Sequence, residues 1–358
     1  MPSLKEIKGR INSISSTLAI TSAMKMVAAA KLQKAQMAIQ NMLPYERRLY
    51  SMLVDLMGAM NISAAASEDG SVRGSGSAER GFDQSGDRLS LSNRHDLAGM
   101  DGAYSLMAQR EVRKVAIVAF ASNSSLCGAF NSNAIREATA VINEYRASGL
   151  RDSDIVVYSV GRKMAEAMRK LGFPSPADFT KMSDSPSYEA VSALAQELLD
   201  GFVSGRFDKV ELVYNHYKST SSQPTTRQTY LPLSLADATA DLQAGKITDS
   251  ASETDTNKVA EPVGAPVVRQ GSPTTEDLIV EPSKEALIAT LLPKVIRLRI
   301  FTTLLDSAAA EHAARTVAMQ LATDNGNDLL QELTLEYNKG RQQKITSEIL
   351  DLVGGSMQ

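Results

Sequence analysis

The most reactive side chains in this 358-residue sequence belong to one cysteine and three histidines. Cys127 follows an apolar run, so its thiolate could act as a nucleophile beside a base or a cation. A free cysteine also serves as a small packing residue, and we favour that role here. His95, His216 and His312 stand far apart, without a carboxylate or thiol at metal-ligand spacing. The sequence therefore predicts neither a metal site nor a catalytic triad.

The glycine patterns that bind phosphate groups are also missing. The turn Ser122–Asn133 (SNSSLCGAFNSN) has one glycine and lacks the Gly-x-Gly-x-x-Gly spacing that lets a backbone approach a pyrophosphate. The one Gly-Lys pair, Gly245-Lys246, is followed by Ile247 instead of the Ser or Thr of a phosphate loop. Ala240 stands where that loop needs a glycine. We therefore expect no nucleotide site and no cofactor.

The centre of the chain alternates predicted strands with predicted helices. The strands are Val112–Phe120, Asp154–Val160 and Lys209–Tyr217, and the helices are Ala134–Ser148, Gly161–Gly172 and Ser187–Val203. Such alternation indicates a parallel sheet covered by helices. We therefore predict a Rossmann-like α/β domain with a mainly parallel sheet over residues 111–235. A ligand crevice at its strand ends, near Cys127, would be the site of an alternative, enzymatic function.

Residues 1–60 predict a helix with the apolar seam of a coiled coil, because apolar residues alternate at spacings of three and four. The seam positions are Leu4, Ile7, Ile11, Ile14, Leu18, Thr21, Lys25, Ala28, Leu32, Ala35, Ile39 and Met42. The seam turns polar at Thr21 and Lys25, where the stretch Ala23–Lys31 (AMKMVAAAK) leaves no clearly polar face. A helix that is apolar on nearly all sides is buried on nearly all sides, so we expect other chains to surround this stretch.

Residues 283–358 predict the partner helix. Over Ala308–Val353 alanine and leucine are dense, proline is absent and apolar residues recur at steps of three and four. At about 1.5 Å per residue, a helix over Ala308–Val353 would be roughly 65 to 70 Å long. It would be too long to lie wholly against one small domain. The turn signal Asn325-Gly326 costs about 1 kcal/mol, which coiled-coil packing can offset, so we predict one helix. Pro293 predicts a kink before it.

Two segments, residues 61–110 and 236–282, have the composition of insertions. The first is rich in Ser, Gly and Asp and lacks helical or strand periodicity, which indicates a mobile segment. The second holds nine acidic and three basic residues, a net charge of −6. Near its end, Asp277–Glu281 predicts an edge strand and Ser283 a helix cap.

Composition and charge narrow the function classes. The sequence is 43% hydrophobic and 22% charged, as in ordinary soluble proteins, and its net charge of −3 argues against general nucleic-acid binding. The first forty residues nevertheless carry six Lys or Arg and the single acid Glu6. This local positive charge suits a binding cavity whose edges carry acidic side chains. No apolar run of eighteen residues, secretory core or transit pattern occurs, so we predict no membrane span. A single cysteine fits a reducing compartment.

Several collinear segments match a family pattern. They are Leu4–Ile11 (LKEIKGRI), Ile20–Leu32 (ITSAMKMVAAAKL), Leu126–Asn133 (LCGAFNSN), Glu311–Met319 (EHAARTVAM), Glu332–Ile349 (ELTLEYNKGRQQKITSEI) and the closing Val353-Gly354-Gly355. Together they resemble the gamma subunit, the central rotor stalk, of F-type ATP synthases. The resemblance covers most of the chain outside the two insertions.

The resemblance implies an antiparallel coiled coil of the terminal helices inside a ring of three alpha and three beta subunits, with the α/β domain as its foot. The foot would bind the epsilon subunit and the c-subunit ring, so that proton-driven rotation opens and closes the beta sites. The chain itself would hold no nucleotide, bind no nucleic acid and catalyse no reaction. It would reach the membrane only through the complex, as a peripheral protein on the cytoplasmic side of the bacterial inner membrane.

The resemblance also implies contact residues. Met24 and Lys25 would lie next to an acidic lever of a beta subunit, and Arg315 and Met319 would interact with the N-terminal segment. A polar catch near the tip would hydrogen-bond to beta loops. Its members are Arg341, Gln342, Thr346 and Glu348.

Two departures from the family pattern limit what is carried over. Ser122–Ser125 (SNSS) stands where the family usually has Ser-Asp-Arg-Gly, so a charged contact from that turn is not assumed. The insertions are longer than the family pattern and would be decoration, a brake on rotation or a contact specific to this lineage. A structural coiled-coil scaffold without rotation is the remaining alternative.

Overall fold

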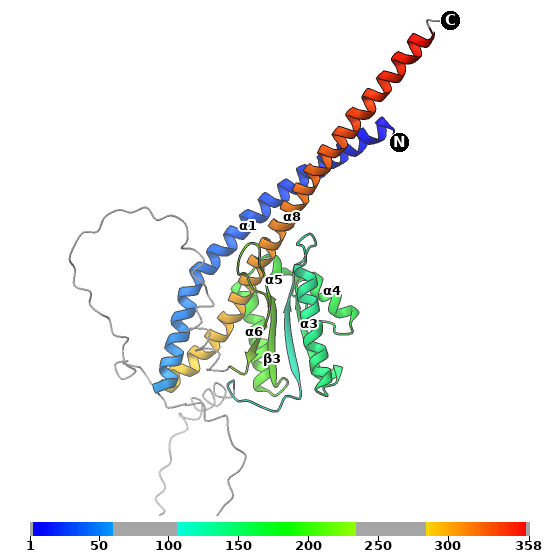
Figure 1. Ribbon diagram of the computed structural model, residues 1–358. Coiled ribbons are helices and arrows are strands. Elements are labelled where there is room, and N and C mark those ends of the chain that lie inside the picture. Colours follow the sequence, from blue (N-terminus) through cyan, green and yellow to red (C-terminus); the bar gives the residue numbers. More distant parts are fainter. Residues whose placement is uncertain (1–2, 60–105, 234–283, 356–358) are drawn as a thin grey trace, which may run out of the picture.

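The computed structural model describes residues 3–59, 106–233 and 284–355 (Figure 1). Two long helices run side by side, and a four-stranded sheet with its helices lies against the end of this pair that is remote from both chain termini. In chain order the elements are α1 (Leu4–Ala59), β1 (Val115–Phe120), α3 (Phe130–Ala147), η1 (Asp152–Asp154), β2 (Ile155–Val160), α4 (Arg162–Lys170), α5 (Thr180–Asp184), α6 (Tyr188–Val203), β3 (Lys209–Asn215), β4 (Thr225–Leu231) and α8 (Lys284–Gly355).

Helices α1 and α8, called the helix pair below, contact each other along most of α1. Leu4 lies against Gly340 and Leu18 against Gly326, so the contacts advance along α1 as they retreat along α8. Further down, Leu32 packs on two alanines of α8. Every seam position predicted on α1 is buried or half-buried. The spacing of three and four therefore identified the contact face of α1 correctly.

Gly326 explains why α8 continues through the predicted turn signal. A Cβ atom at Gly326 would lie only 2.6 Å from Leu18 Cδ2 and 3.2 Å from Leu18 Cγ. Glycine thus lets Leu18 approach the backbone of α8 closely. The prediction of one uninterrupted helix across this site is confirmed. The helix-propensity cost of about 1 kcal/mol is offset by this close packing.

The C-terminal helix runs without a break through the segment predicted to form it. It has 72 residues and starts at Lys284, so at about 1.5 Å per residue it is about 110 Å long. Pro293, predicted as a kink before this helix, lies inside it. The neighbouring Leu292 and Val295 are 0% and 1% exposed. Burial of such side chains at about 1.5–3 kcal/mol each outweighs the roughly 3 kcal/mol that proline costs in a helix.

The sheet has the strand order β2-β1-β3-β4. Strand β1 pairs in parallel with both β2 and β3, whereas β3 and β4 are antiparallel. The three predicted strands and the mainly parallel sheet are confirmed. Strand β4 was not predicted, because its sequence TTRQTYL is polar and only its last two residues are buried.

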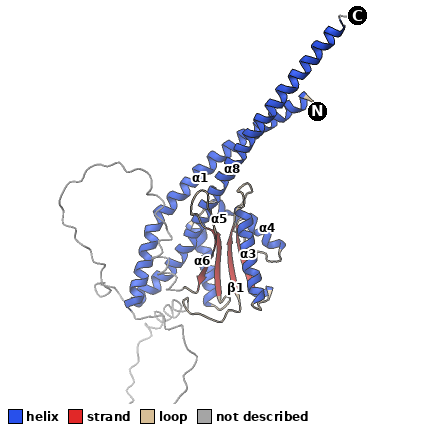
Figure 2. Ribbon diagram, in the orientation of Figure 1, coloured by secondary structure: helices blue, strands red, loops and turns tan. Residues whose placement is uncertain are grey.

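Helices cover both faces of the sheet (Figures 1 and 2). Helices α3 and α4 pack on one face, where Met164 and Met168 are fully buried. On the other face α6 and parts of α1 and α8 share a single core, represented by Phe202, Leu53 and Ile296. Because that core contains all three helices, the helix pair and the sheet form one packed body.

A buried carboxylate ties β3 to β4 and α3. Glu211 is 1% exposed and accepts hydrogen bonds from Tyr145 Oη at 2.6 Å and Arg227 Nε at 2.7 Å. Lys209 Nζ lies 2.7 Å from the same carboxylate. Burial alone would raise the pKa of Glu211, but the hydrogen bonds from Arg227, Lys209 and Tyr145 outweigh it and lower the pKa.

Several element boundaries differ from the predicted ones. Helix α3 begins at Phe130 instead of Ala134, and the short elements α5 and η1 were not predicted. Leu106 is 4% exposed, and its carbonyl accepts a hydrogen bond from the Leu233 amide at 3.0 Å. Leu106 therefore belongs to the packed core, although the sequence placed it in the first insertion.

The remaining predictions for the two insertions concern residues outside the described part of the chain. The same holds for the strand predicted at Asp277–Glu281 and the cap predicted at Ser283.

Candidate functional site

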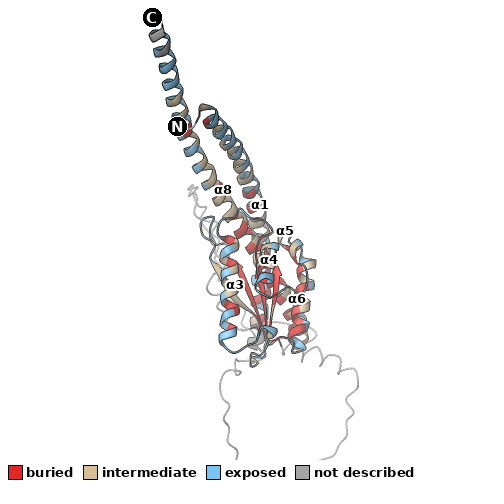
Figure 3. Cartoon of the chain, turned by 90° about the vertical axis from the view of Figure 1, so that its right-hand side faces the viewer, coloured by how far each residue is buried: buried red, intermediate tan, exposed pale blue. Residues whose placement is uncertain are grey.

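The end of the helix pair beyond the sheet exposes large apolar side chains (Figure 3). They are Ile20, Met26 and Val27 on α1, and Leu321, Leu329, Leu335, Ile345, Ile349, Leu350, Leu352 and Val353 on α8. Met26 is 64% and Leu352 is 75% exposed. Burial of one such side chain is worth about 1.5–3 kcal/mol, so an exposed apolar stretch of this length is a candidate contact surface.

Met24 and Lys25 lie at the edge of this exposed stretch, and both are half-buried. Lys25 Nζ donates a hydrogen bond to Gln320 Oε1 on α8. Its neighbours Met26 and Val27, which the sequence analysis had included in the apolar stretch, are the residues that face outward. The structure thus joins Lys25 to α8 and leaves the apolar side chains beside it free for a partner.

The predicted polar catch lies on the part of α8 that extends past the start of α1 (Figure 1). Its members Arg341, Gln342, Thr346 and Glu348 are all exposed. Within the chain, the Thr346 hydroxyl donates to the Gln342 carbonyl at 2.9 Å, and Glu348 lies 3.7 Å from Lys344 Nζ. An exposed ion pair of this kind contributes about 0–1 kcal/mol, so these side chains remain available for other contacts.

Arg315 and Met319 lie on α8, and neither is exposed. Met319 is 4% exposed, and Arg315 pairs with the buried Glu311 at 2.8 Å. Burial raises the pKa of Glu311, the nearby Arg315 and Lys31 oppose that rise, and the charge of Asp184 adds to it. Arg315 therefore stabilises a carboxylate that burial would otherwise disfavour.

His312, next to this ion pair, is held in its neutral form. Burial lowers its pKa to about 4, and the positive charges of Lys31 and Arg315 contribute to the shift. Among the described residues its Nδ1 atom is buried without a hydrogen-bond partner. His312 was considered in the sequence only as a metal ligand, and no sequence signal marked it as a half-buried neutral group.

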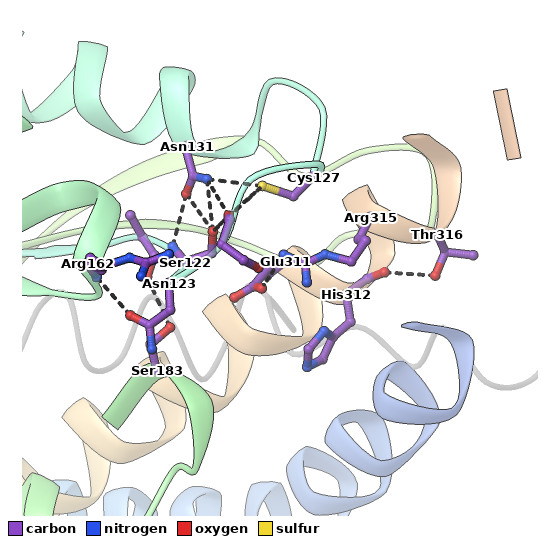
Figure 4. Close-up of polar contacts among 12 residues, drawn as sticks. Ser122, Asn123, Cys127, Asn131, Arg162, Ser183, Glu311, His312, Arg315 and Thr316 are labelled. Atoms are coloured by element: carbon purple, nitrogen blue, oxygen red, sulfur yellow. Dashed lines mark hydrogen bonds and ion pairs between the residues drawn. The ribbon is translucent and has the colours of Figure 1, made fainter. Parts of the chain in front are cut away.

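Cys127 belongs to a polar network at the carboxyl end of β1 (Figure 4). Asn131 donates to Cys127 Sγ at 3.1 Å and accepts from the Ser122 amide at 3.0 Å. The thiol is 1% exposed and packs on Phe130 and on Ala310 of α8. This geometry supports the packing role, since a catalytic thiolate needs access to substrate.

Helix α8 packs at the crevice where an α/β sheet usually binds a ligand. In the order β2-β1-β3 that crevice lies between the carboxyl ends of β1 and β3. There Asn215 donates to the Phe130 carbonyl at 3.0 Å, and the Phe130 ring packs on Ala310. A Cβ atom added to Gly128 would lie 3.8 Å from Ala318. Helix α8 therefore packs directly against the segment that follows β1.

A polar contact between the end of β3 and the helix pair was missed by the sequence analysis. Asp306 on α8 accepts from the Tyr217 amide at 2.9 Å and lies 2.6 Å from His216 Nδ1. Gln36 on α1 donates to the Tyr217 hydroxyl at 2.7 Å. The end of β3 thus contacts both long helices. Sequence spacing could not reveal a site whose residues come from three distant segments.

Within residues 3–59, 106–233 and 284–355, no cluster of three or more His, Cys, Asp or Glu side chains is arranged to hold a metal ion. The helices described in this structure also include none that is long and apolar enough to cross a membrane.

Comparisons with a family model and with curated relatives agree on one family. A family model described as ATP synthase matches residues 3–357. The ATP synthase gamma chain of Phocaeicola vulgatus is 46% identical over 357 residues, with 100% of both chains covered. The ATP synthase gamma chain of Bacteroides thetaiotaomicron is 44% identical over 358 residues, again with 100% coverage of both.

The fold also has a solved counterpart. A chain in the structure of the mitochondrial ATP synthase of Euglena gracilis (OSCP/F1/c-ring, rotational state 3) aligns with a TM-score of 0.52 at 19% identity, covering 99% of this chain and 93% of that one. At that identity the likeness concerns the fold. Full-length identity above 40% to curated relatives, together with the family model, shows that this chain belongs to the ATP synthase gamma chain family.

Proposed function

We propose that this chain is the central rotor of a bacterial ATP synthase. The helix pair is an antiparallel coiled coil that turns inside a ring of alpha and beta subunits, and the sheet domain (residues 106–233) is its foot. Rotation driven by proton flow changes the beta sites in sequence, and ATP hydrolysis turns the shaft the other way. The chain transmits torque and carries out no bond chemistry itself.

The exposed apolar end of the helix pair is the observation that carries this proposal. Met26 and Leu352 face solvent although the sheet end of the same two helices is packed into a core. A soluble protein rarely leaves so long an apolar surface uncovered, so the surface indicates a sleeve formed by other subunits. Apolar contacts have no directional bonds, so subunits that surround the helix pair through such contacts also allow it to turn.

Polar side chains near the tip supply direction within that sleeve. Exposed Arg341 and Gln342 would hydrogen-bond to loops of a beta subunit, with Thr346 and Glu348 beside them. A hydrogen bond to a charged group contributes about 1.5–3 kcal/mol when it is buried. A few such bonds favour particular angles of the shaft without holding it permanently.

The foot would bind the epsilon subunit and the c-subunit ring, and it would bind no nucleotide because α8 packs against the segment that follows β1. Met24 would lie next to an acidic segment of a beta subunit, beside Met26 and Val27. Through the complex alone, the chain would lie at the cytoplasmic face of the inner membrane.

The proposal is tested by co-purification from cells that express a tagged chain with its alpha and beta subunits. Recovery of both subunits, with no ATP hydrolysis by the isolated chain, is expected. Appreciable ATP turnover by the chain alone would contradict the proposal.

A charge introduced on the shaft sharpens the test. Met26→Glu with Val27→Glu adds charges to exposed positions, so the chain should fold and yet lose the alpha and beta subunits. Leu171→Glu is the matched control, because Leu171 is 45% exposed on the sheet domain. Equal recovery of both subunits with the double variant and the control would count against a sleeve around Met26.

A further inference from the structure

A polar layer interrupts the contact between α1 and α8. Lys25 Nζ donates to Gln320 Oε1, and Gln320 Nε2 donates to the Asp324 carboxylate at 2.7 and 2.9 Å. One turn away, the Thr323 hydroxyl donates to the Thr21 hydroxyl at 3.1 Å. All except Asp324, which is exposed, are half-buried. These five residues are called the polar layer below.

Tight apolar contacts lie on both sides of the polar layer. Toward the tip, Leu18 fits against Gly326, where a Cβ atom would approach it to 2.6 Å. Toward the sheet, Leu32 packs on Ala309 and Ala313, which are both 0% exposed. Each contact depends on the position of α1 along α8. Polar side chains of α1 lie opposite polar side chains of α8, and the large Leu18 lies opposite Gly326.

At the sheet end the shared core fixes how α1 and α8 lie against each other. In the part of the helix pair beyond the sheet, an apolar seam alone does not fix how far the two helices slide past each other. A shift by one heptad, about 10 Å along the axis, presents a similar apolar surface to the partner. A shift by one heptad moves Lys25 from the level of Gln320 to that of Ala313 or of Asn327. Beside Ala313 the ammonium group has no amide partner. In either direction Leu18 moves from Gly326 to a large apolar residue, Met319 or Leu333. Single polar residues at seam positions are known to select register in this way.

We propose that the polar layer fixes the axial register of α1 against α8, and so determines how far the tip of α8 projects beyond the start of α1. This inference rests on the proposed rotor function, in which the tip must meet its partner loops at the correct height. Lys25 and Gln320 are then positioning residues, and Lys25 acts within the shaft as well as at its surface.

The register can be measured in the isolated chain by pulsed electron–electron double resonance, which gives the distance between two spin labels. Spin labels are attached to cysteines introduced at Ser15 and Gln343, both exposed and on the tip side of the polar layer, in a Cys127→Ala background. The parent should give one narrow distance. The quadruple variant Thr21→Val, Lys25→Leu, Gln320→Leu and Thr323→Val should add a second population displaced by about 10 Å, with a Tm no lower than that of the parent.

Two further variants separate register selection from general stability. Exchange of the pair, Lys25→Gln with Gln320→Lys, keeps a polar layer and should restore the single distance. Lys34→Leu with Lys339→Leu is the matched control, because both lysines are exposed and the same loss of charge should leave one distance. A single narrow distance in the quadruple variant, or a second one in the control, overturns the proposal.

An activity measurement links register to function. In the assembled complex the quadruple variant should pump fewer protons per ATP hydrolysed than the parent. Failure of the parent chain to assemble would contradict the rotor function, whereas an unchanged register in the isolated quadruple variant would contradict only the role of the polar layer. The two failures are thus distinguishable.

Discussion

The half-buried, neutral His312 predicts that acid weakens this protein, and the substitution His312→Gln isolates the effect. The pKa of His312 falls from an ordinary 6.5 to about 4 in the folded chain. Between these values the unfolded chain binds a proton that the folded chain does not, so the free energy of unfolding decreases as the pH falls. The stabilisation is fully present above pH 6.5 and is lost as the pH approaches 4.

The magnitude follows from the two pKa values. Between pH 7 and pH 5 the linkage relation gives a loss of about 2 kcal/mol, at roughly 1.36 kcal/mol per pKa unit. His312 is partly exposed, so solvent screening reduces the expected loss to about 1 kcal/mol. Glu311 acts in the opposite direction, because burial raises its pKa, with Arg315 and Lys31 opposing the rise and Asp184 adding to it. The wild-type pH profile alone therefore mixes both effects.

The effects of His312 and Glu311 are separated by urea unfolding of the wild type and of His312→Gln. Unfolding is followed by circular dichroism at pH 7 and at pH 5. Glu311 titrates in both proteins, so the difference between their pH dependences reports His312. The wild type should lose about 1 kcal/mol more than the variant over this range. Histidine NMR gives a direct second reading, in which the signal absent from the variant should titrate well below pH 6.

Identical pH dependence of the two proteins would refute this reasoning. A His312 signal that titrates near pH 6.5 would do so as well, because it would show that the surrounding residues do not exclude water from the imidazole.

Three other predictions concern packing, a buried charge and the tip. Gly326→Ala should destabilise the chain by about 1–2 kcal/mol in thermal unfolding, because the new Cβ meets Leu18 at 2.6 Å, and adding Leu18→Ala should recover at least half of that loss. Glu211→Gln should cost about 2 kcal/mol in urea unfolding, since the half-buried Lys209 loses its carboxylate partner and Arg227 keeps only Glu144; a loss below 1 kcal/mol would contradict this. Arg341→Ala with Gln342→Ala should leave the Tm unchanged, because both side chains are exposed, but lower ATP-driven proton pumping; unchanged pumping would favour a scaffold without rotation.

Much of the architecture followed from periodicity alone. Spacings of three and four along α1 identified the residues that face α8, and apolar runs located β1, β2 and β3. Both signals depend on local apolar pattern, which is strong wherever one face of an element is buried. The polar edge strand β4 lacks that pattern, and its place in the sheet comes from pairing with β3.

The local features that depend on partners distant in sequence could not be predicted. Gly326 looked like a turn signal, and only the approach of Leu18 shows why glycine is needed there. Pro293 looked like a kink, yet burial on both sides of it keeps the helix continuous. Asp306 carried no signal, because its contacts with His216 and Tyr217 require the sheet to lie against α8.

The candidate contact residues came from family resemblance, and the structure adds their surroundings. Arg341 and Gln342 are exposed, whereas Arg315 is engaged with Glu311. Lys25 donates a hydrogen bond to Gln320, a partner for which the sequence carries no signal. Physical surroundings thus divide the candidate residues into exposed ones, which we propose to contact other subunits, and ones that contact other residues of this chain.

Direct observation of rotation is the clearest test of the rotor function. A bead is attached through a cysteine introduced at Ser153, which is exposed on the sheet domain, while the catalytic head is fixed to a surface. ATP should turn the bead in one direction, and the rotation should stop when ATP is removed. A bead that stays fixed on complexes that are hydrolysing ATP would contradict the account.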